Sequence, residues 1–415
     1  MAVERLGSIL KHLSPGSSLS QITSKNADDI VITLAIRTPL AKAKKGGFKD
    51  TSLEYMICAL LEQVRERSKL DPALVEDICL GNVSDAKAAY KLRAAALAAG
   101  FPNTTSCYSL NRFCSSGLKA VADIAHAISN GSIEIGLAVG AESMSIGGDA
   151  LEKPFDEAVT SKSQESVDCM QPMGWTSENV SRDFNVTREE MDKYATESFR
   201  RAEAAQKAGL FEDEIVPIKT KVKDADGNWK EVTLTKDEGI RPGTTYEALS
   251  KIRPAFPQWG PTSTGGNSSQ VTDGAAAILL MKRSTAIKLG QPILGKYVGS
   301  TVAGLAPRIM GIGPTVAIPK LLSLYNLTLA DIDVIELNEA FASMAVYCRD
   351  KLGLDWAKMN PRGGAIALGH PLGATGARQI VTGLSECRKT GKKILLTSMC
   401  IGTGMGMAGL FVNEQ

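Results

Sequence analysis

The sequence predicts an α/β protein in which two related halves flank an inserted segment. From Ile30 onward, short β-rich runs alternate with helical runs, which is typical of sheets layered with helices. The same order of elements begins again near Pro292, as expected of a duplicated unit. Between the halves, roughly from 144 to 270, the composition is polar and irregular, which indicates a separate insert.

The first half is expected to contain alternating strands and helices. Apolar and β-branched runs define the strands, while Gly100 and Pro102 close the second helix. We expect strands at 30–36, 77–80, 104–110 and 134–140, and helices at 52–68, 86–99 and 115–130.

The second half repeats landmarks of the first at a constant spacing. Asn82 and Asn338 are 256 residues apart (338 minus 82), and so are Cys114 and His370 (370 minus 114). A shared offset across separate elements favours duplication, although the identities are few and chance agreement is the alternative. If the halves stack about a pseudo-twofold axis, Cys114 and His370 face each other. The expected domains are an N-terminal half at 29–143, a loop domain at 144–270 and a C-terminal half at 271–415.

The insert has two recognisable elements. A capping box at 187–190 begins a helix that runs to about Lys207. A turn at Gly227 separates runs 215–222 and 230–234, which predicts a hairpin. Inserts of this kind usually cover an active site or grip a substrate, and the alternative is a surface elaboration.

Composition argues against several classes of protein. The chain has 47 Lys and Arg against 45 Asp and Glu, and this balance does not indicate a nucleic-acid or membrane-surface binder. The longest apolar runs are far shorter than the roughly 20 residues of a membrane-spanning helix, so we expect no membrane span. The 8 cysteines are scattered, without a C-x-x-C pair or a histidine at metal-ligand spacing, which argues against a metal site and a disulfide framework.

Cys114 and His370 are the first candidates for chemistry. Cys114 lies where a strand end turns into a helix, and the positive end of the helix dipole favours a thiolate nucleophile there. The alternative is a small, buried apolar residue. His370 lies in the glycine-rich segment 360–376, at a helix start where its imidazole can accept a proton. His126 lies within a helix beside an apolar face and is expected to be structural.

Two further segments place polar groups at strand ends. Cys400 is followed by several glycines, whose exposed N–H groups can hold an oxyanion, unless the segment is only a glycine-weakened hairpin. Asn338 lies at a strand-to-helix junction, where its amide can orient a water or carbonyl group or simply cap the helix.

Together these segments resemble the thiolase family, over nearly the whole chain from Ile30 to Val412. The resemblance implies the thiolase fold, in which two stacked mixed β-sheets form five layers α-β-α-β-α with an inserted loop domain, and it implies a homodimer. The motifs that carry the resemblance are C-S-S-G-L (114–118), G-N-S-S-Q-V-T-D-G-A-A-A (266–277), N-E-A-F-A (338–342), G-G-A-I-A-L-G-H-P-L-G (363–373) and C-I-G-T-G (400–404).

The resemblance also implies a role for each residue. Cys114 would be acylated by a 3-ketoacyl thioester of coenzyme A, His370 would activate it, and Cys400 would act as general acid and base. One oxyanion site would combine His370 with a water held by Asn338, and the other would use the backbone N–H groups of Cys114 and Gly402. Coenzyme A would be a co-substrate in ping-pong covalent catalysis, with no permanently bound cofactor and no metal.

Weaker resemblances concern the binding of coenzyme A. Ser269 would meet the pantetheine arm, and Met173 and Phe341 are further expected substrate-binding residues. The alternating lysines of segment 219–223 could meet CoA phosphates, although such a run is more often solvated surface.

Three alternative functions use the same fold. A biosynthetic acetoacetyl-CoA thiolase would use the same residues in the direction of condensation. A non-catalytic acyl-CoA or lipid carrier would be expected to lose Cys114, His370 or Cys400, and all three are present. A ketosynthase would need a second catalytic histidine, which is missing here.

Residues 1–28 are expected to be a targeting leader, because they are rich in serine, leucine and basic residues and poor in acids. Arg5-Leu6 and His12-Leu13 resemble the amino-terminal nonapeptide that a peroxisomal import receptor reads on an amphipathic helix. A mitochondrial leader has a similar composition, and a frayed tail is the structural alternative. We therefore expect a peroxisomal protein, with the mitochondrion as the alternative.

Overall fold

The first half of the chain folds into a sheet with helices on both of its faces. The computed structural model describes residues 18–147 and 155–415. The strands of this half are β1 (Ile30–Arg37), β2 (Ala41–Lys42), β3 (Asp77–Gly81), β4 (Ser106–Leu110), β5 (Ile135–Ser143) and β8 (Thr272–Lys282). Its helices are α2 (Ser18–Thr23), α3 (Leu53–Ser68), α4 (Ala88–Ala98), α5 (Ser116–Ser129) and α11 (Arg283–Lys288), with a 3-10 turn η1 (Pro72–Leu74). Every element expected between 30 and 140 is present, within a few residues of its expected bounds.

The second half repeats the alternation of strands and helices. Its strands are β9 (Gly295–Gly304), β10 (Val334–Leu337), β11 (Ile394–Ile401) and β12 (Met405–Asn413). Its helices are α12 (Pro314–Leu324), α13 (Ala342–Leu352), α14 (Ala365–Leu368) and α15 (Leu372–Thr390), with 3-10 turns η2 (Pro307–Ile312) and η3 (Leu329–Asp331).

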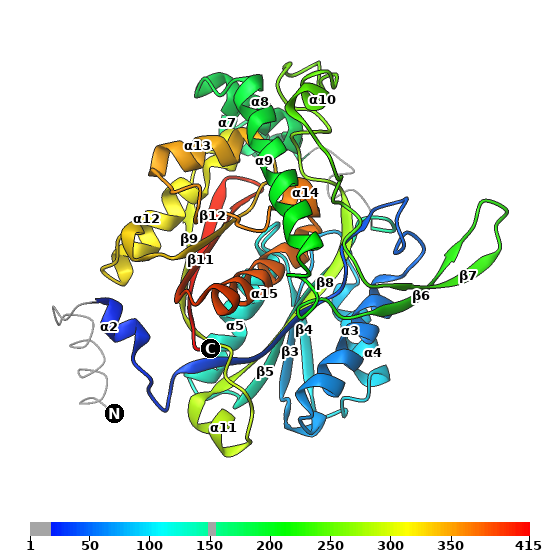
Figure 1. The fold of residues 1–415 in the computed structure, drawn as a ribbon, viewed down its shortest axis with the longest axis vertical. Helices are drawn as coiled ribbons and strands as arrows, with labels where there is room; N and C mark the ends of the chain where they lie inside the picture. Colours follow the sequence, from blue (N-terminus) through cyan, green and yellow to red (C-terminus); the bar gives the residue numbers. More distant parts are fainter. Residues whose placement is uncertain (1–17, 148–154) are drawn as a thin grey trace.

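The helices and the two half-sheets form the expected five layers (Figure 1). Helices α3 and α4 cover the outer face of the first sheet, where Leu60 and Leu92 are buried in one core cluster. Helices α5 and α15 lie between the sheets, and Leu118 and Ile380 share a second cluster there. Helices α12 and α13 cover the outer face of the second sheet. The middle helical layer therefore belongs to both halves.

The two half-sheets are hydrogen-bonded to each other at a single junction. The strand order is β10-β11-β12-β9-β1-β8-β5-β3-β4, so β9 and β1 lie at the centre. Only two residue pairs join these strands, Val31 with Lys296 and Ile32 with Gly295. The halves are otherwise held together by the packing of α15 against α5 and against strands β5, β8 and β1 of the first sheet.

The expected start of the C-terminal half at residue 271 is wrong. Strand β8 pairs antiparallel with β5 along its length and with β1 on its other side, so it is an inner strand of the first sheet. Its run from Ala275 to Met281 is fully buried, as is typical of a strand covered on both faces. The second half begins after this strand, with β9.

The insert is more helical than the sequence suggested. We expected one clear helix, and α9 (Arg188–Lys207) has the expected capping box, with Thr187 accepting from the backbone of Glu190. The insert also contains α6 (Glu157–Thr160), α7 (Gln164–Asp168), α8 (Met173–Asp183) and α10 (Tyr246–Ser250). The expected hairpin is β6 (Ile218–Lys223) and β7 (Trp229–Leu234), and it stands out from the body in Figure 1.

The predicted leader is described only from residue 18 onward. Within it, α2 places Ile22 in the core cluster of the second half, and Lys296 Nζ donates to the carbonyl of Ser24 at 2.7 Å. Residues Arg5, Leu6, His12 and Leu13 of the expected import signal lie outside the described residues. No helix in the described part of the chain is long and apolar enough to cross a membrane.

Candidate active site

Cys114 lies in a strained turn between β4 and α5. Phe113, just before it, has φ of 47°, which is rare for a bulky residue and must be held by its surroundings. Ser116 provides part of that support, since its Oγ accepts from the backbone N–H of Arg112 at 2.9 Å and donates to the carbonyl of Phe113 at 2.6 Å. The turn leaves the Cys114 side chain 8% exposed. A conformation this costly is typical of a functional site.

The first turns of α5 and α15 touch each other, and this brings the two halves of the site together. A Cβ on Gly117 would lie 2.7 Å from the carbonyl oxygen of Gly373, and a Cβ on Gly376 would lie 2.4 Å from the amide of Leu118. Only glycine permits this approach of two backbones. Cys114 and His370 each precede one of these first turns, so they lie at the same end of the middle layer, as the 256-residue offset predicted.

His370 is buried and has a defined partner at each ring nitrogen. Its Nε2 lies 3.4 Å from Asn338 Nδ2, and its Nδ1 lies 2.6 Å from Thr375 Oγ1. Its backbone N–H donates to the carbonyl of Gln270 at 3.1 Å, which ties it to the 266–277 motif. The hydrogen bond to Thr375 fixes the ring plane, and its hydroxyl can pair with either tautomer. Thr375 lies in the same glycine-rich segment, but no sequence pattern indicated a role for it.

Cys400 completes the group at the end of β11. Its Sγ lies 3.6 Å from the sulfur of Met344, and it is buried in a cluster with Phe341. The tight turn that follows directs the backbone N–H of Gly402 toward the sulfur of Cys114. Because a charge on Cys114 also acts on Cys400, the two thiols share one buried region. The structure therefore places Cys114, Cys400 and Gly402 together, and it pairs His370 with Asn338 at the same end of the middle helical layer as Cys114.

Burial controls the protonation of all three titratable groups. Burial raises the pKa of the Cys114 thiol to about 11, although the N–H groups of Gly402 and Cys114 itself act in the opposite direction. Burial, with the nearby charge of Cys114, raises the pKa of Cys400 well above its usual value. Burial and the positive charge of Arg378 lower the pKa of His370 to about 3. The expected thiolate at Cys114 is therefore corrected: without substrate, the site holds neutral thiols and a neutral imidazole.

Glu142 links the two halves near the Cys114 thiol, and no sequence motif indicated this role. It is the penultimate residue of β5 and has no exposed surface, and it accepts from the backbone N–H groups of Val83, Ser84 and Gly373. Burial raises the pKa of its carboxyl, and its charge contributes to the raised pKa of Cys114. An acid at the end of an otherwise apolar strand was the only sequence signal.

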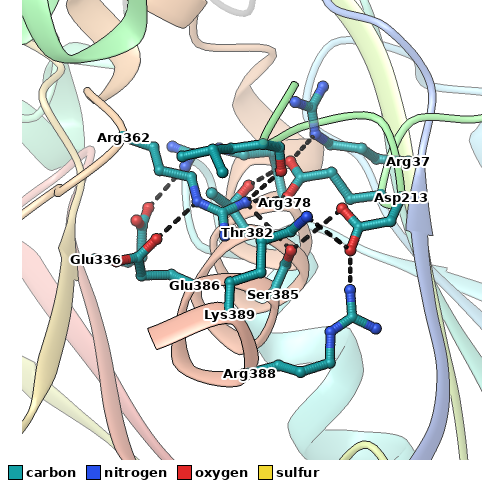
Figure 2. A network of polar contacts seen from close by, with 12 residues as sticks. Arg37, Asp213, Glu336, Arg362, Arg378, Thr382, Ser385, Glu386, Arg388 and Lys389 are labelled. Atoms are coloured by element: carbon teal, nitrogen blue, oxygen red, sulfur yellow. Dashed lines mark hydrogen bonds and ion pairs between the residues drawn. The ribbon is translucent and has the colours of Figure 1, made fainter. Parts of the chain in front are cut away.

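A buried ionic network holds α15 against the rest of the molecule (Figure 2). Arg378 Nη1 donates to Glu336 Oε2 of β10 at 2.7 Å, and Arg362 Nε donates to Glu386 Oε2 at 2.8 Å. Glu214 of the insert accepts from Thr382 and from Arg37, and both Arg37 and Glu214 are buried. The helix that begins beside His370 is thus anchored to the insert and to both halves.

Of the residues expected to bind coenzyme A, some lie beside the Cys400 cluster and one lies at the surface of the insert. The backbone N–H of Ser269 donates to Ala340 at 2.9 Å, and the adjacent Ser268 pairs with Phe341, which belongs to the Cys400 cluster. Met173 begins α8 at the surface of the insert. The structure therefore brings Ser269 and Phe341 to the site and leaves Met173 at its periphery.

The expected phosphate contacts have no visible support. The lysines of segment 219–223 are exposed on the projecting hairpin (Figure 1), where Lys221 pairs with Glu231 and Lys223 lies over the ring of Trp229.

His126 is exposed in the last turn of α5, edge-on to Tyr297, at the opposite end of that helix from Cys114. No group of His, Cys, Asp and Glu able to hold a metal occurs among residues 18–147 and 155–415.

The class of protein follows from this geometry together with sequence comparison. The thiolase N-terminal domain matches residues 30–284, and the thiolase C-terminal domain matches residues 291–413. The boundary between the two matches falls after β8, in agreement with the sheet topology. The chain belongs to the thiolase family.

Two relatives and one solved structure show which thiolases this chain is similar to. The chain is 52% identical to the peroxisomal 3-ketoacyl-CoA thiolase of Yarrowia lipolytica over 99% of this chain and 100% of that protein. It is 47% identical to peroxisomal 3-ketoacyl-CoA thiolase A of Mus musculus over 99% of each chain. Among solved structures, the dimeric peroxisomal thiolase of Saccharomyces cerevisiae superposes with a TM-score of 0.89 at 46% identity, covering 95% of this chain and 100% of that one.

Proposed function

We propose that this protein cleaves 3-ketoacyl-CoA with coenzyme A, giving acetyl-CoA and an acyl-CoA shortened by two carbons, as in the last step of fatty-acid β-oxidation. The proposal is supported mainly by two observations: Cys114 and Cys400 share one buried region, and His370 precedes the helix whose first turn touches that of the Cys114 helix. The relatives named peroxisomal 3-ketoacyl-CoA thiolases support the choice of substrate, because they are similar over nearly the whole chain.

The first half-reaction starts from neutral thiols at Cys114 and Cys400 and a neutral imidazole at His370. Sγ of Cys114 attacks the 3-keto carbon while its proton passes to His370. The C2–C3 bond breaks, and the acetyl-CoA enolate takes the proton of Cys400 at C2. The N–H groups of Cys114 and Gly402 stabilise the negative charge on the ketone oxygen, and His370 with a water held by Asn338 stabilises that on the thioester oxygen. After this half-reaction the enzyme carries an acyl thioester on Cys114, an imidazolium at His370 and a thiolate at Cys400.

The second half-reaction restores the free enzyme. The thiol of coenzyme A gives its proton to the Cys400 thiolate, and its sulfur attacks the acyl thioester. Cys114 leaves as a thiolate and takes back the proton held by His370. Each group returns to its starting protonation state, so the cycle needs no external acid, base or oxidant.

Mass spectrometry after incubation with a 3-ketoacyl-CoA tests this function. We expect one acyl adduct, on Cys114, and none in Cys114→Ala. Cys58→Ala is the matched control, because that half-buried thiol lies on α3 outside the site, and it should be labelled like the wild type. An adduct on another cysteine, or no adduct on any, would refute the assignment.

A biosynthetic acetoacetyl-CoA thiolase is the second candidate. One solved neighbour is an acetyl-CoA acetyltransferase of Bacillus anthracis, at 35% identity and a TM-score of 0.84, covering 94% of this chain and 100% of that one. Turnover of acetoacetyl-CoA and of 3-ketoacyl-CoA with eight or more carbons separates the two, because activity confined to the shortest chain would favour biosynthesis.

The proposed setting is a homodimer in the peroxisome, as the names of the relatives suggest. Light scattering after size-exclusion chromatography tests the dimer.

Fusing residues 1–28 to a fluorescent protein tests the leader. Peroxisomal import should be lost when Arg5 and Leu6 are replaced, and mitochondrial fluorescence would contradict the peroxisomal address. The insert at 144–270 is proposed to cover the site and to contribute contacts to coenzyme A.

A further inference from the structure

A buried carboxylate beside the site, that of Glu339, has no role in the proposed reaction. The residue is 1% exposed, and each of its carboxylate oxygens accepts two hydrogen bonds. Oε1 accepts from Tyr194 Oη at 2.9 Å and from Asn360 Nδ2 at 2.8 Å. Oε2 accepts from Ser198 Oγ at 2.7 Å and from the backbone N–H of Ile366 at 3.1 Å. These four bonds offset the cost of burying the carboxylate.

The four donors come from two distant parts of the chain. Two are on α9 of the insert, one helical turn apart, and two lie in the glycine-rich segment 360–376 that contains His370. Helix α9 lies against α14 of that segment (Figure 1). A Cβ on Gly364 would lie 2.2 Å from Cδ of Glu339, so the backbone of the segment rests on the carboxylate itself. Glu339 therefore joins the insert to the segment that leads to His370.

The backbone on either side of Asn338 is held by the same group of contacts. Asn360 Oδ1 accepts from the N–H of Leu337 at 2.8 Å, and Asn360 Nδ2 donates to the carbonyl of Leu337 at 2.8 Å. The side chain of Asn338 has weaker support. Its Nδ2 lies 3.4 Å from His370 Nε2, and its Oδ1 is buried without a hydrogen-bond partner in the described part of the chain. The position of this amide therefore depends on the backbone around it.

Only a carboxylate satisfies all four donors. Each oxygen of Glu339 faces one N–H group, from Asn360 or from Ile366, that can donate but cannot accept. The Asn360 amide cannot be reversed, because its Oδ1 accepts from Leu337. In Glu339→Gln, either orientation of the new amide places its NH₂ group against one of these two donors. That contact must open, and the segment that carries His370 must move.

We propose that Glu339 is a positioning residue that fixes the distance between Asn338 and His370, because it joins the backbone at Asn338 to the segment that carries His370. The inference rests on the proposed function and adds one residue to its site. In that function, His370 and the water held by Asn338 stabilise the thioester oxygen of the enolate. This enolate forms in the first half-reaction and not in the second. Loss of the alignment should therefore slow acylation of the enzyme more than deacylation.

Rapid-quench measurements of the two half-reactions test the proposal. In Glu339→Gln we expect acylation of Cys114 by 3-ketooctanoyl-CoA to slow by about tenfold or more, since removing one oxyanion donor costs about 10²- to 10³-fold. Deacylation by coenzyme A, and alkylation of Cys114 by iodoacetamide, should change much less. Asp333→Asn is the matched control, because this acid precedes the other end of β10 and its Oδ2 accepts from the backbone N–H groups of Lys393 and Ile394. Both of its half-reactions should keep wild-type rates.

The other outcomes separate the positioning role from the proposed function. Acylation at the wild-type rate in Glu339→Gln overturns the positioning role, and so does equal slowing of acylation, deacylation and alkylation, which would indicate a general distortion. If that variant does not fold, Tyr194→Phe decides, because it removes one donor and keeps the carboxylate. A lowered ratio of acylation to deacylation in Tyr194→Phe supports the proposal, and an unchanged ratio overturns it. If the wild type forms no acyl-enzyme, the proposed function itself fails.

Discussion

The most consequential residue-scale property is the protonation of Cys114. Burial raises its pKa to about 11, so only a small fraction is thiolate at neutral pH. Since the thiolate is the species that alkylates, inactivation by iodoacetamide should accelerate about tenfold per pH unit between pH 7 and 9. Rates measured under pseudo-first-order conditions, with peptide mapping of Cys114, check this. A rate that reaches a plateau below pH 8 would contradict it and indicate a preformed ion pair with His370.

Thr375 is predicted to be a positioning residue for His370. Its hydroxyl lies 2.6 Å from Nδ1, and it is fully buried on α15. Thr375→Val keeps the shape but leaves the buried Nδ1 without a partner, so kcat should fall by about tenfold or more, with a loss of stability of about 1–3 kcal/mol. Thr375→Ser keeps the hydroxyl and should restore most of the activity. A normal kcat in the valine variant would show that the ring is oriented by other contacts.

At the scale of elements, the buried pair between β10 and α15 predicts a pH-dependent stability. Burial raises the pKa of Glu336 to about 7, above its ordinary value of 4.5, even though Arg378 lies 2.7 Å away. The folded state therefore binds more protons than the unfolded state between these two values, and the contribution of Glu336 to stability decreases as pH rises from about 4.5 to 7.

Glu336→Gln isolates this effect, because the variant keeps an acceptor for Arg378 and cannot ionise. Relative to the variant, the wild type should lose on the order of 1–3 kcal/mol between pH 5 and pH 8. Thermal unfolding of both proteins across that range measures the difference, and all groups that titrate alike in both proteins cancel. Parallel curves would mean that Glu336 keeps one charge state throughout.

Local sequence signals explain which helices and strands could be predicted. The helix α9 has a capping box and an apolar stripe, and both are local signals that the sequence carries. The helix α8 was missed because its buried face consists largely of small and polar residues such as Thr176, Ser177 and Asn179. The membership of β8 was missed because strand pairing is a long-range property that no local pattern specifies.

The residues of the active site also divide into those that local sequence signals predicted and those that they did not. Motif spacing located Cys114, His370 and Cys400, since each lies at a strand or helix end with glycines beside it. The protonation states were predicted wrongly for Cys114, because the helix N-terminus is a local feature whereas desolvation depends on everything packed around the thiol. Glu142 was missed for the same reason: its partners come from both halves of the chain.

At the scale of the whole molecule, the site depends on how closely the two halves approach. The halves share only two pairs of strand residues, so their relative position rests mainly on the packing of α15 against α5, β5 and β8. At its closest point this is a contact of backbone on backbone, with Gly117 against Gly373. A displacement there would separate Cys114 from His370 without touching either side chain.

Gly117→Val is the direct test. The added Cβ would lie 2.7 Å from the carbonyl of Gly373 and 2.8 Å from the amide of Ala377, and backbone atoms cannot rotate away. Overpacking of this kind costs about 1–3 kcal/mol, and even a partial separation of the helices should lower kcat/KM by more than 100-fold, since about 1 Å of misplacement can have that effect. Gly304→Val is the control, because the nearest atom to its Cβ is 4.0 Å away and its backbone is ordinary strand. Activity assays and thermal unfolding of both variants decide the matter: if Gly117→Val keeps wild-type activity, the two halves are held in register by something other than this contact.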